Sequence, residues 1–183
     1  MRAAKQLFVA GCAVALSAMP LGRGTSEAVA SAGTRSGHID PVSASELLDI
    51  HNRERARLGL VPLQWSPQLA RQAGEWAIKL ARTSGLAHST GGSGMGENLW
   101  IGTRGTWTPD QMLGFFLAER SKFRDARFPH VSRTGNWADV GHYTQIVWHD
   151  TREVGCAIAT ANQVDVLVCR YYPAGNVVGQ SPY

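Results

Sequence analysis

The sequence predicts an α+β fold in which helices dominate the first part of the chain and strands the last. Segments with helix caps and apolar residues at helical spacing lie between about residues 43 and 123. Runs rich in β-branched and aromatic residues fill most of the chain after residue 140. Strands and helices do not alternate regularly, as they would in a parallel βαβ fold, so the strands are expected to pair antiparallel.

Residues 1–32 are predicted to be a secretory signal peptide. Arg2 and Lys5 precede the apolar run "LFVAGCAVALSAMPLG", and small residues that suit cleavage end at Ala30 and at Ala32. A membrane anchor is the alternative, but the run is shorter than the roughly 20 apolar residues that span a bilayer. The prediction is therefore an exported protein, secreted to the extracellular space or periplasmic, with no stable membrane anchor.

The exported chain would consist of a short leader, residues 33–42, and one domain, residues 43–183. A chain of about 150 residues is enough for one domain that buries roughly 70% of its unfolded surface. Cleavage would also lower the formal net charge of +4 by two, because it removes three basic residues and one acidic residue. No Lys/Arg cluster remains, so nucleic acid is not an expected partner.

The first two predicted helices have clear boundaries. "SASELLDIHNRERARLGL" opens with Ser43 as an N-cap candidate and Glu46 three residues later, a capping-box pattern, and should end near Gly59. "SPQLARQAGEWAIKLART" has Ser66 as its cap and Pro67 at the first helical position. The apolar stripe of this second helix is the strongest helical pattern in the chain: Leu69, Ala73, Trp76, Ala77 and Leu80.

The remaining elements are a strand, a third helix and three C-terminal strands. A glycine-rich loop, "GGSGMG", leads into the short strand "ENLWIG". The third helix begins at Thr108–Pro109 and runs through "DQMLGFFLAERSKF", and residues 124–140 are irregular. Three strands are expected over residues 142–148, 153–159 and 164–172.

Cys156 and Cys169 are the cysteines that remain after removal of the signal peptide. They flank "AIATANQVDVLV", which is typical of a strand, a turn and a second strand. A turn centred on Asn162 and Gln163 would place the two cysteines opposite each other. Because an even pair in an exported protein favours a disulfide, we expect a Cys156–Cys169 bond that contributes about 3 kcal/mol in the chain-entropy model. The alternative, a metal-binding cysteine pair, lacks Cys-x-x-Cys spacing.

Glu119 lies on the apolar face of the third helix. The other residues of that face are Met112, Phe116 and Phe123. Burying a carboxylate among apolar side chains costs several kcal/mol unless it has partners. Either the helix rolls so that Glu119 reaches water at the border of the face, or Glu119 belongs to a site.

Three further residues are candidates for a site with Glu119. Glu97 follows the glycine loop, His88 follows the second helix, and His142 lies in the last part of the chain. Each alone has an ordinary explanation, as a solvated carboxylate, a surface histidine and a hydrogen-bonded core histidine. Together, two imidazoles and two carboxylates on four segments are the residue types of a divalent-metal or acid–base site.

Other catalytic patterns are absent from the sequence. There is no His-Glu-x-x-His motif of a thermolysin-like zinc protease. Ser93 in "GGSGM" lacks the closing glycine of a nucleophile elbow, and the loop glycines do not have the spacing of a dinucleotide or phosphate loop. With both cysteines expected in a disulfide, a thiol nucleophile is also excluded, and no organic cofactor is expected.

Four segments carry a family resemblance. They are "HNRERARLGLVPLQW" (51–65), "GENLW" (96–100), "GHYTQIVW" (141–148) and "VLVCRYYPAGNV" (166–177). They resemble the motifs of the CAP superfamily, also called the SCP domain, which includes cysteine-rich secretory, antigen 5 and pathogenesis-related proteins. The resemblance runs from about residue 45 to 177 in the family's order. A single disulfide and the lack of a cysteine-rich C-terminal domain suit a bacterial-type, single-domain member.

The resemblance implies a fold and a site. The fold would be an α-β-α sandwich with a central antiparallel sheet. The site would be a large cleft formed by four family residues, which map to His88, Glu97, Glu119 and His142. In relatives the two histidines can hold zinc or magnesium while the glutamates bond its waters, which implies that His88 and His142 are the metal ligands here.

The resemblance leaves two classes of function. The first is a secreted binding protein that takes a lipid, a sterol or another small ligand, or an extracellular partner, next to a metal-sensitive cleft. The alternative is a metal-dependent, protease-like hydrolase in which Glu97 or Glu119 activates a metal-bound water. The sequence offers no nucleophile, and this favours binding over catalysis.

Overall fold

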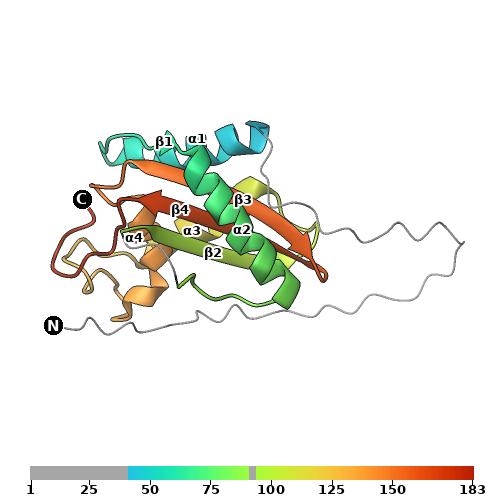
Figure 1. Cartoon of the computed structure of the whole chain (residues 1–183). Helices are drawn as coiled ribbons and strands as arrows, with labels where there is room; N and C mark the ends of the chain where they lie inside the picture. The colour runs from blue at the N-terminus through green and yellow to red at the C-terminus, as the bar shows by residue number, and fades with distance from the viewer. Residues whose placement is uncertain (1–40, 91–93) are drawn as a thin grey trace, which may run out of the picture.

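The structure, a computed structural model that describes residues 41–90 and 94–183, contains helices on both faces of one sheet (Figure 1). The predicted signal peptide and most of the leader lie outside these residues. None of the helices in the described part of the chain has the length and apolar character needed to span a bilayer. The elements are α1 (Pro41–Arg57), β1 (Gln64–Trp65), α2 (Pro67–Thr83), β2 (Gly96–Thr103), α3 (Pro109–Ala118), the 3₁₀ turns η1 (Glu119–Lys122) and η2 (Trp137–Asp139), α4 (Gly141–Ile146), β3 (Glu153–Ala161) and β4 (Val164–Tyr172).

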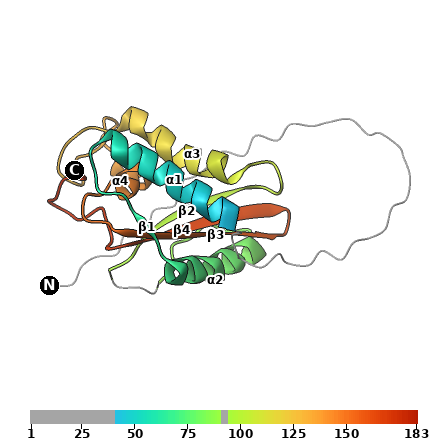
Figure 2. The ribbon, with the colours of Figure 1, turned by 90° about the horizontal axis from the view of Figure 1, so that it is seen from above.

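The helices form layers on the two faces of the sheet (Figure 2). α2 covers one face, over β3 and β4, while α1 and α3 pack on each other over the opposite face. Gly155 in β3 shows how closely α2 approaches the sheet, because a Cβ at this position would come within 2.3 Å of the backbone nitrogen of Ala70. These layers confirm the predicted α+β fold and its α-β-α arrangement.

The sheet is antiparallel except at one edge. Its strand order is β1-β3-β4-β2, and β4 pairs antiparallel with both of its neighbours. Asn162 and Gln163 have φ angles of 45° and 65°, as in the two-residue turns that match the twist of a hairpin, and this confirms the predicted turn. β1 pairs parallel with β3 over two residues and was not predicted.

The predicted disulfide is confirmed. Cys156 and Cys169 are opposite each other in the β3–β4 ladder and are joined by a disulfide, with their Cα atoms 4.0 Å apart. Both residues are fully buried within the hydrophobic core.

The first three predicted helices form, with some shifted boundaries. α2 begins at Pro67 as predicted, and its apolar stripe is buried or half-buried. α3 begins at Pro109 as predicted but ends at Ala118, after which the chain tightens into η1. α1 begins at Pro41, ahead of the predicted cap Ser43, so the capping-box interpretation at that residue is wrong.

The strand predicted over residues 142–148 is wrong, because this segment begins with the helix α4. The residues from Tyr143 to Trp148 are all buried, so no alternation of exposed and buried positions marks a strand. A short segment buried on all sides has the same apolar composition in either conformation. α4 also lacks a local side-chain cap at its N-terminus, and residues from distant elements hold both of its ends.

Fully buried Arg55 of α1 holds the carboxyl end of α4. Its Nη1 donates to the carbonyl oxygens of Ile146 and Trp148, both at 2.9 Å, and its Nη2 donates to that of Thr151 at 3.2 Å. These carbonyls belong to the last residue of α4 and to the segment that follows it, and a cation at the carboxyl end of a helix also suits the helix dipole. Burial lowers the pKa of Arg55 to about 10, so the guanidinium is still charged at neutral pH.

Candidate functional site

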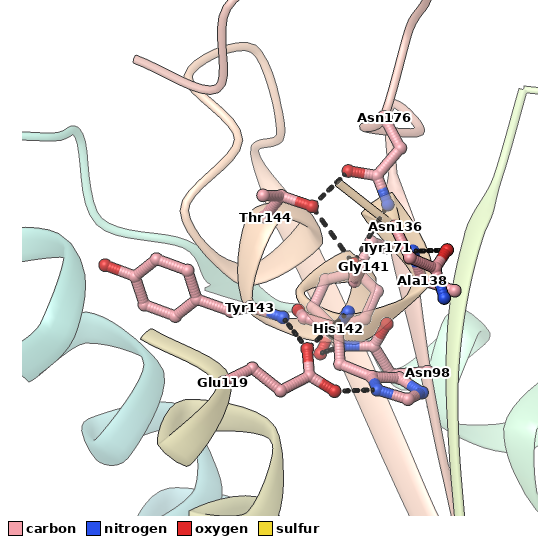
Figure 3. A network of polar contacts seen from close by, with 10 residues as sticks. All are labelled: Asn98, Glu119, Asn136, Ala138, Gly141, His142, Tyr143, Thr144, Tyr171 and Asn176. Atoms are coloured by element: carbon pink, nitrogen blue, oxygen red, sulfur yellow. Dashed lines mark hydrogen bonds and ion pairs between the residues drawn. The ribbon is translucent and has the colours of Figure 1, made fainter. Parts of the chain in front are cut away.

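Glu119 and His142 form the first of two histidine–glutamate pairs (Figure 3). Glu119 is the first residue of η1, directly after α3, and His142 is the second residue of α4. Glu119 Oε1 lies 2.6 Å from His142 Nδ1, and Oε2 accepts the backbone N–H groups of His142 and Tyr143 at 3.0 and 3.1 Å. The ring of His142 also stacks on Phe116, with 4.6 Å between centroids. The carboxylate therefore caps α4 and orients the imidazole at the same time.

A buried polar network lies behind His142. Asn98 Nδ2 donates to the carbonyl oxygen of His142 at 3.0 Å and to the Tyr171 hydroxyl at 3.2 Å (Figure 3). His51 Nδ1 lies 2.7 Å from the carbonyl oxygen of Leu47, which can only accept, so Nδ1 carries the proton. The Tyr171 hydroxyl, 2.9 Å from His51 Nε2, then donates to that nitrogen. Burial lowers the pKa of His51 to about 4, so this network contains a neutral imidazole at neutral pH.

His88 and Glu97 form the second pair. Glu97 Oε1 accepts hydrogen bonds from His88 Nδ1 and from the backbone N–H of Ser89, both at 3.0 Å, and Oε2 accepts from the Ser89 hydroxyl at 2.9 Å. Arg170 lies opposite Glu97 in the β2–β4 ladder, with its Nη2 3.3 Å from Oε2. Burial alone would raise the pKa of Glu97, but the hydrogen bonds from His88 and Ser89 outweigh burial and hold the pKa below its ordinary value.

Both pairs leave one imidazole nitrogen available to a metal. Each Nδ1 faces a carboxylate oxygen, which accepts, so in the neutral ring Nδ1 carries the proton and Nε2 presents a lone pair. Neither Nε2 has a hydrogen-bond partner among the described residues. Zinc-binding histidines have this arrangement, with a carboxylate holding the other ring nitrogen. Magnesium prefers oxygen ligands, so the donors at His88 and His142 fit zinc better.

The two pairs do not bring their ligand atoms into one compact cluster. No three of the four predicted site residues, all of which the structure describes, have ligand atoms within 4.8 Å of one another. A group that does meet this distance is His51, Cys156 and Cys169. Its sulfurs are bonded to each other and both of its ring nitrogens are hydrogen-bonded, so this group cannot hold an ion while the disulfide is intact. A cation at the paired histidines would have its remaining positions open to water or a ligand.

A cavity of about 290 Å³ lies beside the His88–Glu97 pair. It is also lined by Arg170 of β4, Gln145 of α4 and Asn176 of the C-terminal segment. Of the four predicted site residues, only His88 and Glu97 line it. The cavity therefore joins one histidine–glutamate pair to residues from the last two family motifs.

Sequence reasoning missed four polar residues of this cavity wall: Ser89, Gln145, Arg170 and Asn176. Arg170 stands in "CRYY", within a strand whose neighbours are apolar, and a charged residue in a buried strand is a signal that could have identified it. Gln145 and Asn176 are polar residues inside the motifs "GHYTQIVW" and "PAGNV". Nothing in the local spacing shows that these two motifs meet.

A second missed cluster joins α1, η1 and α4. The Tyr143 hydroxyl donates to Glu54 Oε1 at 3.0 Å, and Arg57 and Arg120 pair with the same carboxylate at 2.7 and 3.1 Å. Burial would raise the pKa of Glu54, but the bonds from Arg57 and Tyr143 lower it. The cluster contributes to the position of α4 and hence of His142.

Comparison with known proteins identifies the family. Residues 48–171 match the model of the cysteine-rich secretory protein family, CAP. Pathogenesis-related protein 1C of Nicotiana tabacum is 38% identical over 143 residues, which cover 77% of this chain and 81% of that protein. Pathogenesis-related protein 1 of Arabidopsis thaliana is 32% identical over 142 residues, which cover 77% of this chain and 83% of that protein.

Solved structures share the fold at lower identity. The crystal structure of NaASP2 with Zn²⁺ matches with a TM-score of 0.69 at 20% identity, covering 81% of this chain and 88% of that chain. The structure of BmVAL-1 matches with a TM-score of 0.62 at 22% identity, covering 81% and 85%. These structures support the fold, and the sequence matches establish the family. The chain belongs to the CAP family of cysteine-rich secretory proteins.

Proposed function

We propose that this chain is an exported binding protein whose ligand site is organised by the two histidine–glutamate pairs around a divalent cation, most suitably zinc. Its signal-peptide pattern and its disulfide support export. The Nε2 atoms of His88 and His142 would hold the cation. When bound, the cation supplies a Lewis-acidic position for an oxygen or nitrogen atom of a ligand.

The observation that carries this proposal is the set of partners around the Glu97 carboxylate. Each of its oxygens faces two donors: His88 Nδ1 and the Ser89 N–H at Oε1, and the Ser89 hydroxyl and Arg170 Nη2 at Oε2. Three of its roughly four lone-pair sites accept hydrogen bonds, and the positive charge of Arg170 lies 3.3 Å from Oε2, which makes this carboxylate a poor acceptor for a proton from a water. The lowered pKa of Glu97 also makes it a weaker base. Glu97 therefore orients His88 and does not activate water.

Zinc binding tests the cation site. We expect calorimetry on the exported chain to show zinc binding that the double substitution His88→Ala and His142→Ala abolishes. His130→Ala is the matched control, because His130 is an exposed imidazole that belongs to neither pair. Equal zinc affinity in the wild type and the double variant would show that the ligand assignment is wrong.

Hydrolysis is the alternative, and Glu119 is the residue that favours it. Its Oε2 accepts two backbone N–H groups, but its Oε1 accepts only from His142 Nδ1 among the described residues, so one acceptor position is open. If Glu119 were a general base, Glu119→Gln should lower turnover by about 10²–10⁴-fold at saturating zinc. We expect no peptidase activity in either form. Clear wild-type hydrolysis that disappears in a folded Glu119→Gln protein would establish the hydrolase instead.

For the ligand we propose a lipid, a sterol or another small hydrophobic molecule, with an extracellular protein as the alternative partner. An aromatic cluster on β2, α3 and the segment between them supports this choice: Trp100, Trp107 and Phe115. Trp107 and Phe115 are 38% and 42% exposed although they contact each other at 5.0 Å between centroids. Exposed apolar clusters of this kind mark binding surfaces. Glu119→Gln should leave hydrophobic binding nearly unchanged, because buried apolar area supplies its affinity.

A further inference from the structure

Arg170 is a buried cation with unused hydrogen-bonding capacity. Its side chain is only 10% exposed, and its charge is balanced by Glu97 across the β2–β4 ladder. Buried arginines are rare unless they are paired and their donors satisfied. The arrangement of its remaining donors therefore indicates what else it binds.

Most N–H groups of this guanidinium have no protein partner. Nη2 donates to the Ser89 hydroxyl at 3.1 Å and lies 3.3 Å from Glu97 Oε2. Nε is enclosed and has no partner. Nη1 also lacks a partner among the described residues. Unlike Nε, it is not fully buried, so it is accessible to a ligand. Because Arg170 lines the 290 Å³ cavity and is otherwise enclosed, we infer that the accessible Nη1 faces that cavity.

Each polar side-chain atom of the serine and amide residues in the cavity wall has a protein partner. Gln145 Oε1 accepts the backbone N–H of Gly175 at 2.9 Å, and its Nε2 donates to Thr151 Oγ1 at 3.2 Å. Asn176 Nδ2 donates to a backbone carbonyl of α4 at 2.9 Å, and its Oδ1 accepts a hydroxyl of the same helix. Apart from the His88 Nε2 assigned to the cation, the accessible polar atom of the cavity wall that has no protein partner is the positively charged donor Nη1. The ligand group must therefore be an acceptor, and an anionic one pairs best.

We propose that Arg170 makes this cavity a binding site for a carboxylate group. Nη1 presents N–H donors that share the positive charge of the guanidinium, and a carboxylate oxygen accepts from such a donor in a charge-assisted hydrogen bond. Glu97 already places one negative charge beside Arg170, so a singly charged carboxylate is accommodated better than a doubly charged phosphate. The cavity volume of about 290 Å³ lies just below the roughly 300–1,000 Å³ of small-molecule pockets, so the site holds a short acid or the end of a longer ligand.

This site goes beyond the proposed cation site, because Arg170 acts without a metal. Carboxylate binding can therefore be measured in the presence of EDTA, where failure of zinc binding has no effect on the result. Carboxylate binding by the His88→Ala and His142→Ala double variant would separate the two sites further.

The test is an NMR titration of the exported chain with propionate and with its neutral analogue propionamide, at constant ionic strength. Saturable shifts of the backbone amides of Ser89 and Ala174 are expected with propionate, with at least tenfold weaker binding of propionamide. Arg170→Gln should remove the response, whereas Arg82→Gln, which removes one exposed positive charge, should retain it. Equal responses to the acid and the amide, or unchanged propionate binding in Arg170→Gln, would overturn the proposal.

Two additions keep the test decisive. Arg170→Gln leaves Glu97 without its cation, so the double variant Glu97→Gln and Arg170→Gln removes both charges and preserves folding. It too must lose propionate binding. Tetraalanine with a free or an amidated C-terminus distinguishes the source of the carboxylate. Binding of the free peptide alone indicates a peptide terminus, and binding of propionate without the peptide indicates a small acid.

Discussion

The two histidine–glutamate pairs contain the same side chains but stabilise their carboxylates differently. Glu119 is held by backbone N–H groups at the start of α4, which are partial charges fixed by the fold. Glu97 is held by Ser89 and by the full charge of Arg170. The imidazole of His142 is 24% exposed, whereas that of His88 is 52% exposed.

Because of this difference, the position of the His142 side chain is fixed by several contacts, whereas that of His88 can adjust. His142 is held by its carboxylate, by stacking on Phe116 and by Asn98 at its carbonyl. Among the described residues, the His88 side chain has one hydrogen bond, to Glu97, and lies in the segment between α2 and β2. Changes near His142 should therefore cost stability, while changes at His88 itself should affect binding alone.

Glu97→Ala should have the largest effect on stability, because it changes the histidine–glutamate pair whose carboxylate is balanced by a full positive charge, that of Arg170. The substitution leaves Arg170 buried without its carboxylate, and breaking a buried pair in this way costs about 3–5 kcal/mol. Urea denaturation would measure the lost free energy of unfolding. The control is the double variant Glu97→Gln and Arg170→Gln, which removes both charges but keeps an acceptor for Ser89, and which should lose much less stability than Glu97→Ala. A loss below about 1 kcal/mol in Glu97→Ala would show that Arg170 does not depend on this partner.

Acid should weaken the network behind His142 next. The pKa of His51 is about 4 in the folded protein against 6.5 in an unfolded chain, so the unfolded state binds a proton first as pH falls. The contribution of neutral His51 to the free energy of unfolding is fully present above pH 6.5. It declines toward pH 4, by roughly 3 kcal/mol in total. Glu97 behaves differently. Its pKa is lowered in the folded protein, so its contribution to the free energy of unfolding is retained until the pH falls below about 4.5.

The measurement is the free energy of unfolding at several pH values between 7 and 4.5. His51→Gln lacks the titrating group but keeps a polar side chain for Tyr171, so its stability should fall less over this range. Parallel curves for the two proteins would show that His51 does not control the acid response.

Single alanine substitutions of the two histidines should show the smallest effects and the sharpest contrast. His88→Ala should change the free energy of unfolding by no more than about 0.5 kcal/mol, as at other exposed positions. His142→Ala should cost about 1–2 kcal/mol, because Glu119 loses a hydrogen bond and Phe116 its stacking partner. Thermal denaturation without added metal would compare them, and equal shifts would contradict the distinction between the pairs.

Local patterns predicted the elements whose causes are local. α2 has its proline, its apolar stripe and a left-handed residue after its end, all within its own segment. The β3–β4 hairpin likewise has its turn residues and its cysteines at matching positions. A carboxylate on an apolar face drew attention to Glu119, but that pattern left its role open, and the family resemblance placed it in the site.

The errors and omissions arose where the cause lies elsewhere in the chain. The segment 142–148 was predicted as a strand from its β-branched and aromatic residues. The carboxylate that caps its helix belongs to Glu119, 23 residues before His142, so the local sequence does not show a helix start. Arg170 was missed because its role depends on the pairing of β4 with β2. Which polar residues meet is set by the packing of distant segments, and neither composition nor periodicity contains that information.

The distant partners at both ends of α4 also determine when it can form during folding. A six-residue helix is too short to be stable by itself, and its ends depend on Glu119 and on Arg55, 91 residues before Ile146. We therefore expect α4 to be unformed in the folding transition state, with φ-values near zero. Substitutions in it would then mainly accelerate unfolding. On this expectation, His142 reaches its position beside Glu119 only after α1, α3 and the sheet have assembled, so this histidine–glutamate pair is one of the last features of the molecule to form.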